Sequence, residues 1–133
     1  MEVDKARAPR GELQIRTLAM PADTNPSGDI FGGWVLSQMD IAGGIAAVDR
    51  AKGRVATVGI EAMTFVAPVK VGDVVCCYGD VERVGRTSIA IAIEAWRLNT
   101  VSGQTERELV TEGVFTYVAI DDTGNKRSVD PEV

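Results

Sequence analysis

A carboxylate, Asp40, lies in the middle of the most apolar stretch of the chain, residues 31–53. Burying a carboxylate is costly unless it is hydrogen-bonded, paired with a cation or placed at a wet cleft. At helical spacing, Ser37, Asp40 and Gly44 share one face, which is polar and has a gap where glycine lacks a side chain. This face is either a place for a carboxylate that transfers protons or the solvated side of a helix.

Two features precede or open that stretch. Asn25 lies in a run of turn-forming residues, 21–29, where an asparagine before a proline is also ordinary loop chemistry. Gly32 and Gly33 open the predicted helix, where glycine lets a ligand approach the free N–H groups at the positive end. Such donors can polarise a carbonyl as an oxyanion hole does, although glycine also serves close packing between a helix and a sheet.

A second group of candidates is basic and hydroxylated. The run Gly85, Arg86, Thr87 and Ser88 is typical of a hairpin turn, and it also offers N–H groups, hydroxyls and a guanidinium to a phosphate. Arg54, just after the apolar stretch, is another candidate cation. Neither spacing matches a Walker A or dinucleotide-binding motif. These five residues are therefore candidates for contact with a phosphate group, with a plain turn as the alternative.

The chain has no histidine. This excludes Ser-His-Asp and Cys-His nucleophiles, the HExxH zinc site and a histidine general base, so proton transfer would fall to carboxylates, amides and water. We expect no metal site. The two cysteines, Cys76 and Cys77, are adjacent and in a strand would point to opposite faces, so no disulfide between them is expected. They are typical of small core residues in a reducing cytoplasm.

Periodicity and turn residues predict the elements that position these candidates. Alternation over residues 13–18 predicts a strand, and residues 31–53 predict one long helix that ends at Gly53. Four further strands are expected at residues 55–65, 73–84, 87–98 and 109–120. Short turns join the last three, so these should be antiparallel neighbours. One helix laid on a strongly curved antiparallel sheet of about five strands is an α+β arrangement.

Composition sets the class of protein. A length of 133 residues fits one domain, and a net charge of −5 argues against binding to nucleic acid or to an anionic membrane. The N-terminal residues have no apolar segment typical of a secretory signal, and no run reaches the roughly 18 apolar residues of a membrane-spanning helix. A single sheet with one helix leaves edge strands to cover, which favours a homodimer.

Two long runs resemble the bacterial YciA-type acyl-CoA thioesterases: RTLAMPADTNPSGDIFGGWVLSQMD from residue 16 and GRVATVGIEAMTFVAPVKVGDVVCCYGDV from residue 53. The resemblance covers residues 11–124. It implies a single hotdog domain over residues 13–124, with a flexible tail at 1–12 and a C-terminal tail at 125–133. It also implies a cytoplasmic enzyme of fatty acid metabolism that forms dimers, commonly joined into hexamers as trimers of dimers.

The same resemblance implies hydrolysis of acyl-CoA to a free acid and CoA. No cofactor is implied, since CoA is part of the substrate and the product. Asp40 matches the family's catalytic helix aspartate, and Asn25 matches the loop asparagine that meets it from the opposite protomer. Gly32 and Gly33 would face the thioester carbonyl, and residues 85–88 match a region near bound CoA.

The residues leave several alternatives open. Asp40 could act as a general base on water or attack the thioester directly to give a mixed anhydride. The alternative function is a noncatalytic CoA or acyl-CoA binding or sensing module on the same fold, although Asp40 and Asn25 together favour the enzyme. A purely structural protein leaves Asp40 unexplained. Trp34, Met63 and Phe65 are candidates to line the acyl tunnel, whose preferred chain length the sequence leaves open.

Overall fold

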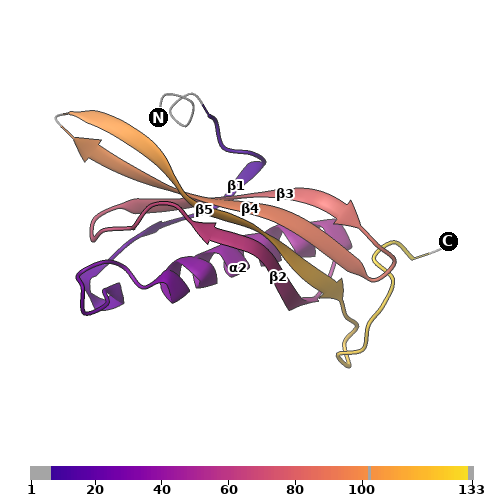
Figure 1. Cartoon of the computed structure of the whole chain (residues 1–133). Helices are drawn as coiled ribbons and strands as arrows, with labels where there is room; N and C mark the ends of the chain where they lie inside the picture. The colour runs from indigo at the N-terminus through magenta and orange to yellow at the C-terminus, as the bar shows by residue number, and fades with distance from the viewer. Residues whose placement is uncertain (1–6, 102, 132–133) are drawn as a thin grey trace.

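The computed structural model describes residues 7–101 and 103–131. In chain order its elements are β1 (Glu12–Leu18), the short 3-10 helix η1 (Pro21–Asp23), α2 (Gly32–Ala51), β2 (Val55–Phe65), β3 (Val74–Val84), β4 (Ser88–Val101) and β5 (Gln104–Ala119). Figure 1 shows the long helix below the sheet, and the helix and the first three strands occur where the periodicity predicts them.

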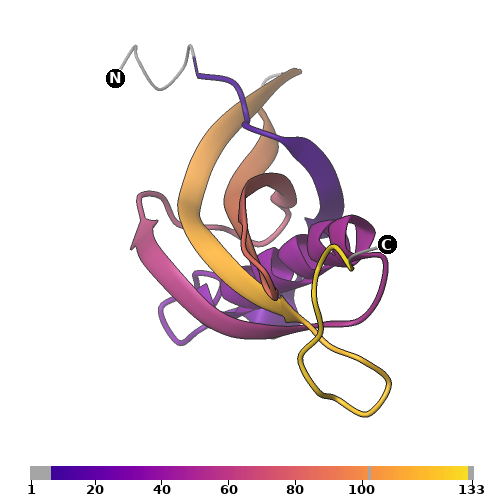
Figure 2. The same cartoon turned by 90° about the vertical axis from the view of Figure 1, so that its right-hand side faces the viewer.

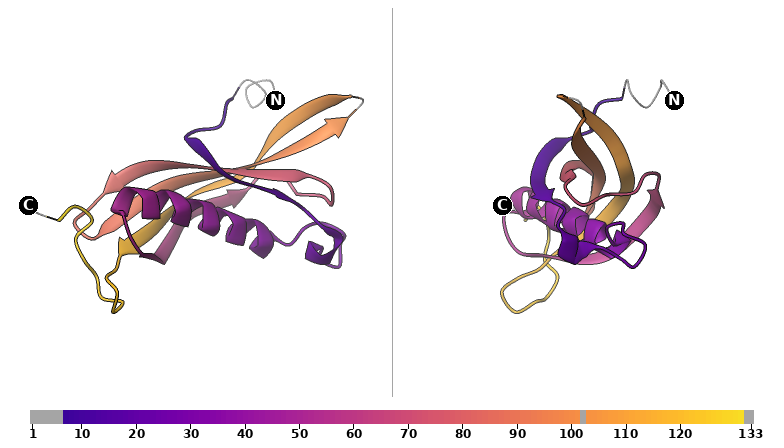
Figure 3. Two further views of the ribbon diagram at one scale, coloured as in Figure 1. Left: turned by 180° about the vertical axis from the view of Figure 1, so that it is seen from behind. Right: turned by 90° about the vertical axis from the view of Figure 1, so that its left-hand side faces the viewer.

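The strands form one antiparallel sheet in the order β1-β3-β4-β5-β2. As the short turns predict, β3, β4 and β5 are neighbours in space. The sheet curves around α2, so that its two edge strands, β1 and β2, approach the helix from opposite sides (Figures 2 and 3). The predicted α+β arrangement of one helix wrapped by a curved antiparallel sheet is confirmed.

The core lies between α2 and the concave face of the sheet. From the helix it takes small and flexible side chains such as Met39, Ala42 and Ala47, and from β4 it takes alternate isoleucines. This close packing leaves Cys77 in the core and Cys76 buried on the other face, both free as predicted. No helix in the described part of the chain is both long and apolar enough to cross a membrane.

The end of α2 differs from the expectation. Lys52, not Gly53, adopts the left-handed conformation, with φ of 55°, and its N–H donates to the carbonyl of Val48. Gly53 is needed for space instead, because a Cβ there would lie 2.6 Å from the guanidinium of Arg127. The glycine therefore admits a cation to the helix end rather than ending the helix itself.

The hairpin between β4 and β5 is longer than predicted. The expected break at residues 99–104 and the start of a strand at Leu109 are wrong, because β5 already begins at Gln104. The polar run before Leu109 hides this strand, yet Arg107 pairs with Leu98 and Arg97 forms an ion pair with Glu108. Cross-strand pairs therefore hold the polar hairpin together, and it projects beyond the body of the sheet (Figure 1).

Part of the expected N-terminal tail lies outside the described residues, which begin at Arg7. Arg7 binds Glu94 and Glu112 on the convex face of the sheet, and Arg10 forms an ion pair with Asp80. These contacts fasten the segment before β1 across the face opposite the helix.

The segment after β5 returns to the end of α2. Val129 is buried, and its N–H donates to the carbonyl of Arg86. Asp130 forms a two-point ion pair with Arg50 of the helix, with N–O distances of 2.7 and 2.8 Å. Residues 127–130 thereby connect the helix end with the β3–β4 turn.

Candidate active site

Asp40 is half-buried between α2 and the sheet, and one of its oxygens is held by two hydroxyl groups. The hydroxyl of Thr57 donates to Oδ1 at 2.7 Å, and the phenol of Tyr117 lies 3.0 Å from the same oxygen. Within residues 7–101 and 103–131, Oδ2 has no hydrogen-bond partner and the carboxylate has no ion-pair partner. One oxygen is therefore oriented by the protein and the other is left to accept a proton.

The register of the sheet brings the two hydroxyls together. Thr57 of β2 and Tyr117 of β5 are directly opposite each other in the antiparallel ladder, so their side chains share the face that looks toward α2. The sequence did not single out either residue. Alternation marks each strand, but only the pairing of β2 with β5, sixty residues apart in sequence (117 − 57), shows that both reach Asp40.

Tyr117 acts on Asp40 as a donor. Burial, and then the neighbouring Asp40 carboxylate, raise the pKa of this phenol above its usual range. The phenol therefore keeps its proton at neutral pH. Burial likewise raises the pKa of the Cys77 thiol to about 12, which argues against a thiolate nucleophile.

Asn25 lies in the loop before α2, and its side chain is partly used by that loop. Its Oδ1 accepts hydrogen bonds from the N–H groups of Ser27 at 2.9 Å and Asp29 at 3.2 Å. The side-chain NH₂ has no acceptor within the described residues and is left as a donor. Asn25 borders a pocket of about 390 Å³ whose other walls are mostly apolar, formed by residues that include Ile30, Gly32, Val35, Phe65, Val66, Val69 and Val110.

Gly32 and Gly33 begin α2, so their N–H groups have no partner inside the helix. Phe31, the residue before them, makes no side-chain cap. A Cβ at Gly33 would meet nothing within 4 Å, and one at Gly32 would lie 3.6 Å from the ring of Phe65. The helix therefore begins with two amides that no side chain caps. Gly32 borders the apolar pocket, as does Phe65 of the predicted tunnel residues.

A single chain does not bring all four predicted catalytic residues together. The helix from Gly32 to Asp40 rises by about 12 Å, at 1.5 Å per residue. Asn25 and the two glycines therefore lie at one end of α2, and Asp40 lies in its middle.

Exposed apolar side chains occur on α2 and on the edge strand β2 that contacts Asp40. They include Ile41 and Val48 on α2 and Val58 and Ile60 on β2, each at least 41% exposed. An open strand edge beside such a surface is typical of a face that pairs with another chain.

The predicted phosphate-contact residues gather at the end of the sheet near the C-terminus of α2. The carbonyl of Arg54 accepts the N–H of Ile120, and the carbonyl of Thr87 accepts the N–H of Ala119, so both segments flank the end of β5. The guanidinium of Arg54 reaches two nearby carbonyl oxygens. Arg86 borders a pocket of about 590 Å³ together with residues 127, 128, 130 and 131.

Gly85 and Ser88 close the β3–β4 turn. The N–H of Gly85 donates to the carbonyl of Ser88 at 2.8 Å, and a Cβ at Gly85 would lie 2.8 Å from the Ser88 hydroxyl oxygen. The turn is therefore tight, as a short hairpin connection requires.

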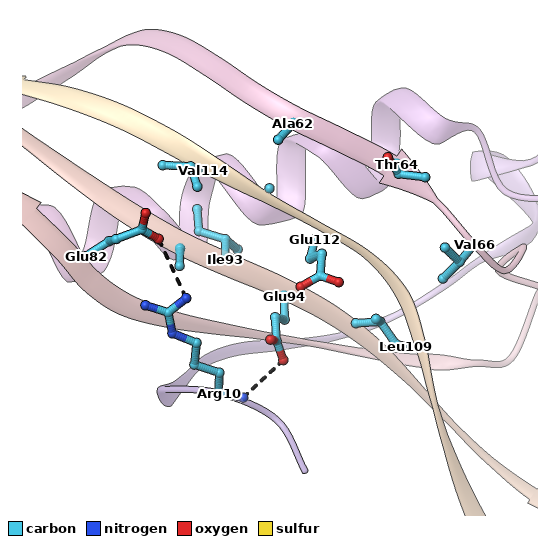
Figure 4. Close-up of a pocket in the computed structure, with 12 residues that line it drawn as sticks. Arg10, Ala62, Thr64, Val66, Glu82, Ile93, Glu94, Leu109, Glu112 and Val114 are labelled. Atoms are coloured by element: carbon cyan, nitrogen blue, oxygen red, sulfur yellow. Dashed lines mark hydrogen bonds and ion pairs between the residues drawn. The ribbon is translucent and has the colours of Figure 1, made fainter. Parts of the chain in front are cut away.

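Another pocket, of about 320 Å³, lies on the convex face of the sheet (Figure 4). Its charged lining residues are Arg10, Glu82, Glu94 and Glu112. None of the candidate residues lines it, and α2 lies on the far side of the strands in this view.

Known proteins resemble the chain over most of its length. The family model described as the thioesterase superfamily matches residues 27–103. The acyl-CoA thioester hydrolase YciA of Escherichia coli (strain K12) is 54% identical over 125 residues, which cover 93% of this chain and 95% of that protein. An uncharacterized acyl-CoA thioester hydrolase of Haemophilus influenzae is 53% identical over 127 residues, covering 95% and 82% of the two chains.

Solved structures of thioesterases also match the chain over most of its length. A hexameric thioesterase from Yersinia pestis has a TM-score of 0.86 and 58% identity, and the match covers 94% of this chain and 100% of that one. A hexameric broad-specificity acyl-coenzyme A thioesterase has a TM-score of 0.87 and 52% identity, with coverage of 95% and 86%. The helix wrapped by five antiparallel strands is thus the hotdog fold. The chain belongs to the thioesterase superfamily and, within it, to the YciA-type acyl-CoA thioester hydrolases.

Proposed function

We propose that this protein hydrolyses acyl-CoA thioesters to a free acid and CoA, with Asp40 as the general base. The observation that carries the proposal is the half-buried Asp40 carboxylate, which has one oxygen held by two hydroxyls and the other without a partner in the described chain. The acyl-CoA thioester hydrolases that resemble the chain support the choice of substrate.

In the proposed reaction, Asp40 Oδ2 takes a proton from water while the water oxygen bonds to the thioester carbonyl carbon. The carbonyl oxygen gains negative charge, which the N–H groups of Gly32 and Gly33 and the NH₂ of Asn25 stabilise; each such donor contributes about 3 kcal/mol. The intermediate then collapses, the C–S bond breaks, and the thiolate takes the proton from Asp40. The acid loses its remaining proton to solvent.

Direct attack by Asp40 on the carbonyl carbon is the competing route, and it would pass through a mixed anhydride that water then opens. Both routes need the same carboxylate and the same carbonyl donors. Neither requires a metal or a further cofactor.

Each active site in this proposal is shared by two copies of the chain. The separation of about 12 Å along α2 keeps Asp40 away from Gly32 of its own chain, whereas the apolar face around Asp40 and the open edge of β2 can pair with a second copy. Asp40 of one protomer would then face Asn25 and the helix amides of the other. The solved relatives are hexameric, so we propose three such dimers per assembly.

The two ends of the substrate would lie in different pockets. The apolar pocket beside Asn25 and Phe65 suits the acyl chain, since it adjoins the proposed carbonyl donors. Arg54 and residues 85–88 would lie near the phosphates of CoA, where Arg86 offers a guanidinium beside an open pocket. The two free, buried cysteines suit a reducing compartment, and we place the reaction in the cytoplasm.

The decisive test compares Asp40→Asn with Asp49→Asn, an exposed carboxylate on the same helix. Release of CoA thiol from acyl-CoAs of graded chain length is measured for both. We expect Asp40→Asn to lower kcat by about 10²- to 10⁴-fold, with the oligomer intact and Asp49→Asn unchanged. Tight acyl-CoA binding without turnover in the unmodified protein would instead support the binding or sensing module.

A further inference from the structure

Tyr117 reaches Asp40 at two atoms. Its hydroxyl lies 2.9 Å from the backbone carbonyl of Asp40 and 3.0 Å from the carboxylate Oδ1. A buried tyrosine needs one partner for its O–H, and the carbonyl alone would satisfy it. The additional approach to the carboxylate is therefore not explained by the packing of the core.

A gap in the helix surface allows this approach. A Cβ at Gly43 would lie 2.2 Å from the Tyr117 hydroxyl oxygen and 2.4 Å from Cδ1 of Ile93. Gly43, one turn after Asp40, thus makes room for the phenol between β5 and the helix. Thr57, opposite Tyr117 in the ladder, donates to the same oxygen from the more exposed side.

We infer that Tyr117 is a positioning residue: its hydrogen bond to Oδ1 holds the Asp40 carboxylate so that Oδ2 is presented to the attacking water. The inference rests on the proposed function. Thr57 from β2 and Tyr117 from β5 are the polar groups that face the carboxylate, and no charged side chain pairs with it in the part of the chain that the structure describes.

The test replaces Tyr117 by phenylalanine, which keeps the ring and removes only the donor. We expect kcat to fall about tenfold at unchanged KM, since a hydrogen bond to a charged group is lost. A purely structural tyrosine would instead lower the melting temperature and leave kcat per folded molecule unchanged.

Tyr78→Phe is the matched control, because Tyr78 is the other tyrosine in the chain and lies on β3. In that background, incorporation of 3-fluorotyrosine alters only Tyr117 and strengthens its donation. It should lower kcat at unchanged KM, because a carboxylate that accepts a stronger hydrogen bond is a weaker base. This arm decides the question if Tyr117→Phe fails to fold. An inactive wild-type protein would defeat the proposed function, whereas an active wild-type protein whose kcat neither change moves would overturn the positioning role alone.

Discussion

Two carboxylates lie on opposite sides of the sheet, one on strand β4 and the other on the helix that packs against the concave face, and their surroundings differ. Glu94, on the convex face, is 3% exposed. Its Oε2 accepts from the guanidinium of Arg7 at 2.5 Å, and its Oε1 accepts from the N–H of Arg10 and the indole of Trp96. Asp40, on the helix that packs against the concave face, has only neutral hydroxyl donors within residues 7–101 and 103–131, and both reach the same oxygen.

The difference separates an anchor from a reacting group. Both oxygens of Glu94 are occupied, and a cation compensates its burial, so it stabilises the position of the N-terminal segment. Asp40 is oriented at Oδ1 and has no partner at Oδ2 among the residues that the structure describes, which is the arrangement that a general base needs. Glu94 also borders the pocket in Figure 4, so a pocket with carboxylates does not by itself mark an active site.

The largest expected effect comes from mixing two inactive variants, so that a second copy of the chain supplies the groups that Asp40 needs for catalysis. Asn25→Ala and Asp40→Ala should each be inactive alone, because each removes one group from every shared site. After subunit exchange, half of randomly mixed dimers are hybrids, and each hybrid has one intact site. We therefore expect roughly a quarter of wild-type activity to return, measured as CoA thiol release.

In the matched control, chains with Asp40→Ala are mixed with chains that carry Gly32→Pro. The proline removes one N–H group at the start of the helix. It should also recover activity, since the glycine is proposed to lie on the same side of the site as Asn25. Proven subunit exchange, by mass spectrometry of isotope-labelled chains, without any recovery would contradict a site shared in this way.

The next largest effect is expected on the convex face. Glu94→Ala leaves the indole N–H of Trp96 buried without an acceptor and removes a partner of Arg7, so it should destabilise the fold by about 3 kcal/mol. Turnover per folded molecule should stay close to wild type. Urea unfolding at fixed protein concentration measures the first quantity, and kcat measures the second.

Glu82→Ala is the control on the same face. Glu82 is exposed, and its carboxylate lies 3.6 Å from the guanidinium of Arg10. A surface ion pair of this kind contributes less than about 1 kcal/mol to the free energy of unfolding. Equal losses of stability for Glu82→Ala and Glu94→Ala would remove the distinction between the anchor and its exposed neighbour.

The sequence predicts most of the fold because its elements depend on local patterns. The helix over residues 32–51 follows from its apolar composition, and alternation locates β2 and β3 to within one residue. The prediction from local patterns fails in the β4–β5 hairpin, where polar residues continue the ladder through cross-strand pairs. A local pattern cannot show which distant side chain pairs with a polar residue.

The same limit applies to the candidate site. Asp40 stands out in sequence because a carboxylate is unusual in so apolar a helix, but Thr57 and Tyr117 are ordinary strand residues until β2 pairs with β5. Likewise Glu94 and Arg7 are 87 residues apart, and only the folded chain shows that they are partners. Residue type identifies the reacting group, and long-range register identifies what orients it.

The smallest expected effect concerns the pH dependence of the ion pair between Arg7 and Glu112 on the convex face. Arg7, by its hydrogen bond and its charge, holds the pKa of Glu112 below its ordinary value of 4.5. A carboxyl whose pKa is lowered in the folded state adds stability above its ordinary pKa, and this stability is lost as pH falls through the lowered value.

Arg7→Gln should therefore lower the melting temperature by a few degrees at pH 7, with a difference from wild type that shrinks below about pH 4.5. Scanning calorimetry from pH 3 to 7 measures it, while kcat per folded molecule at pH 7 should not change. A difference that stays constant across this range would mean that Arg7 acts through packing on Trp96, whose ring centroid lies 5.9 Å from its guanidinium, rather than through charge.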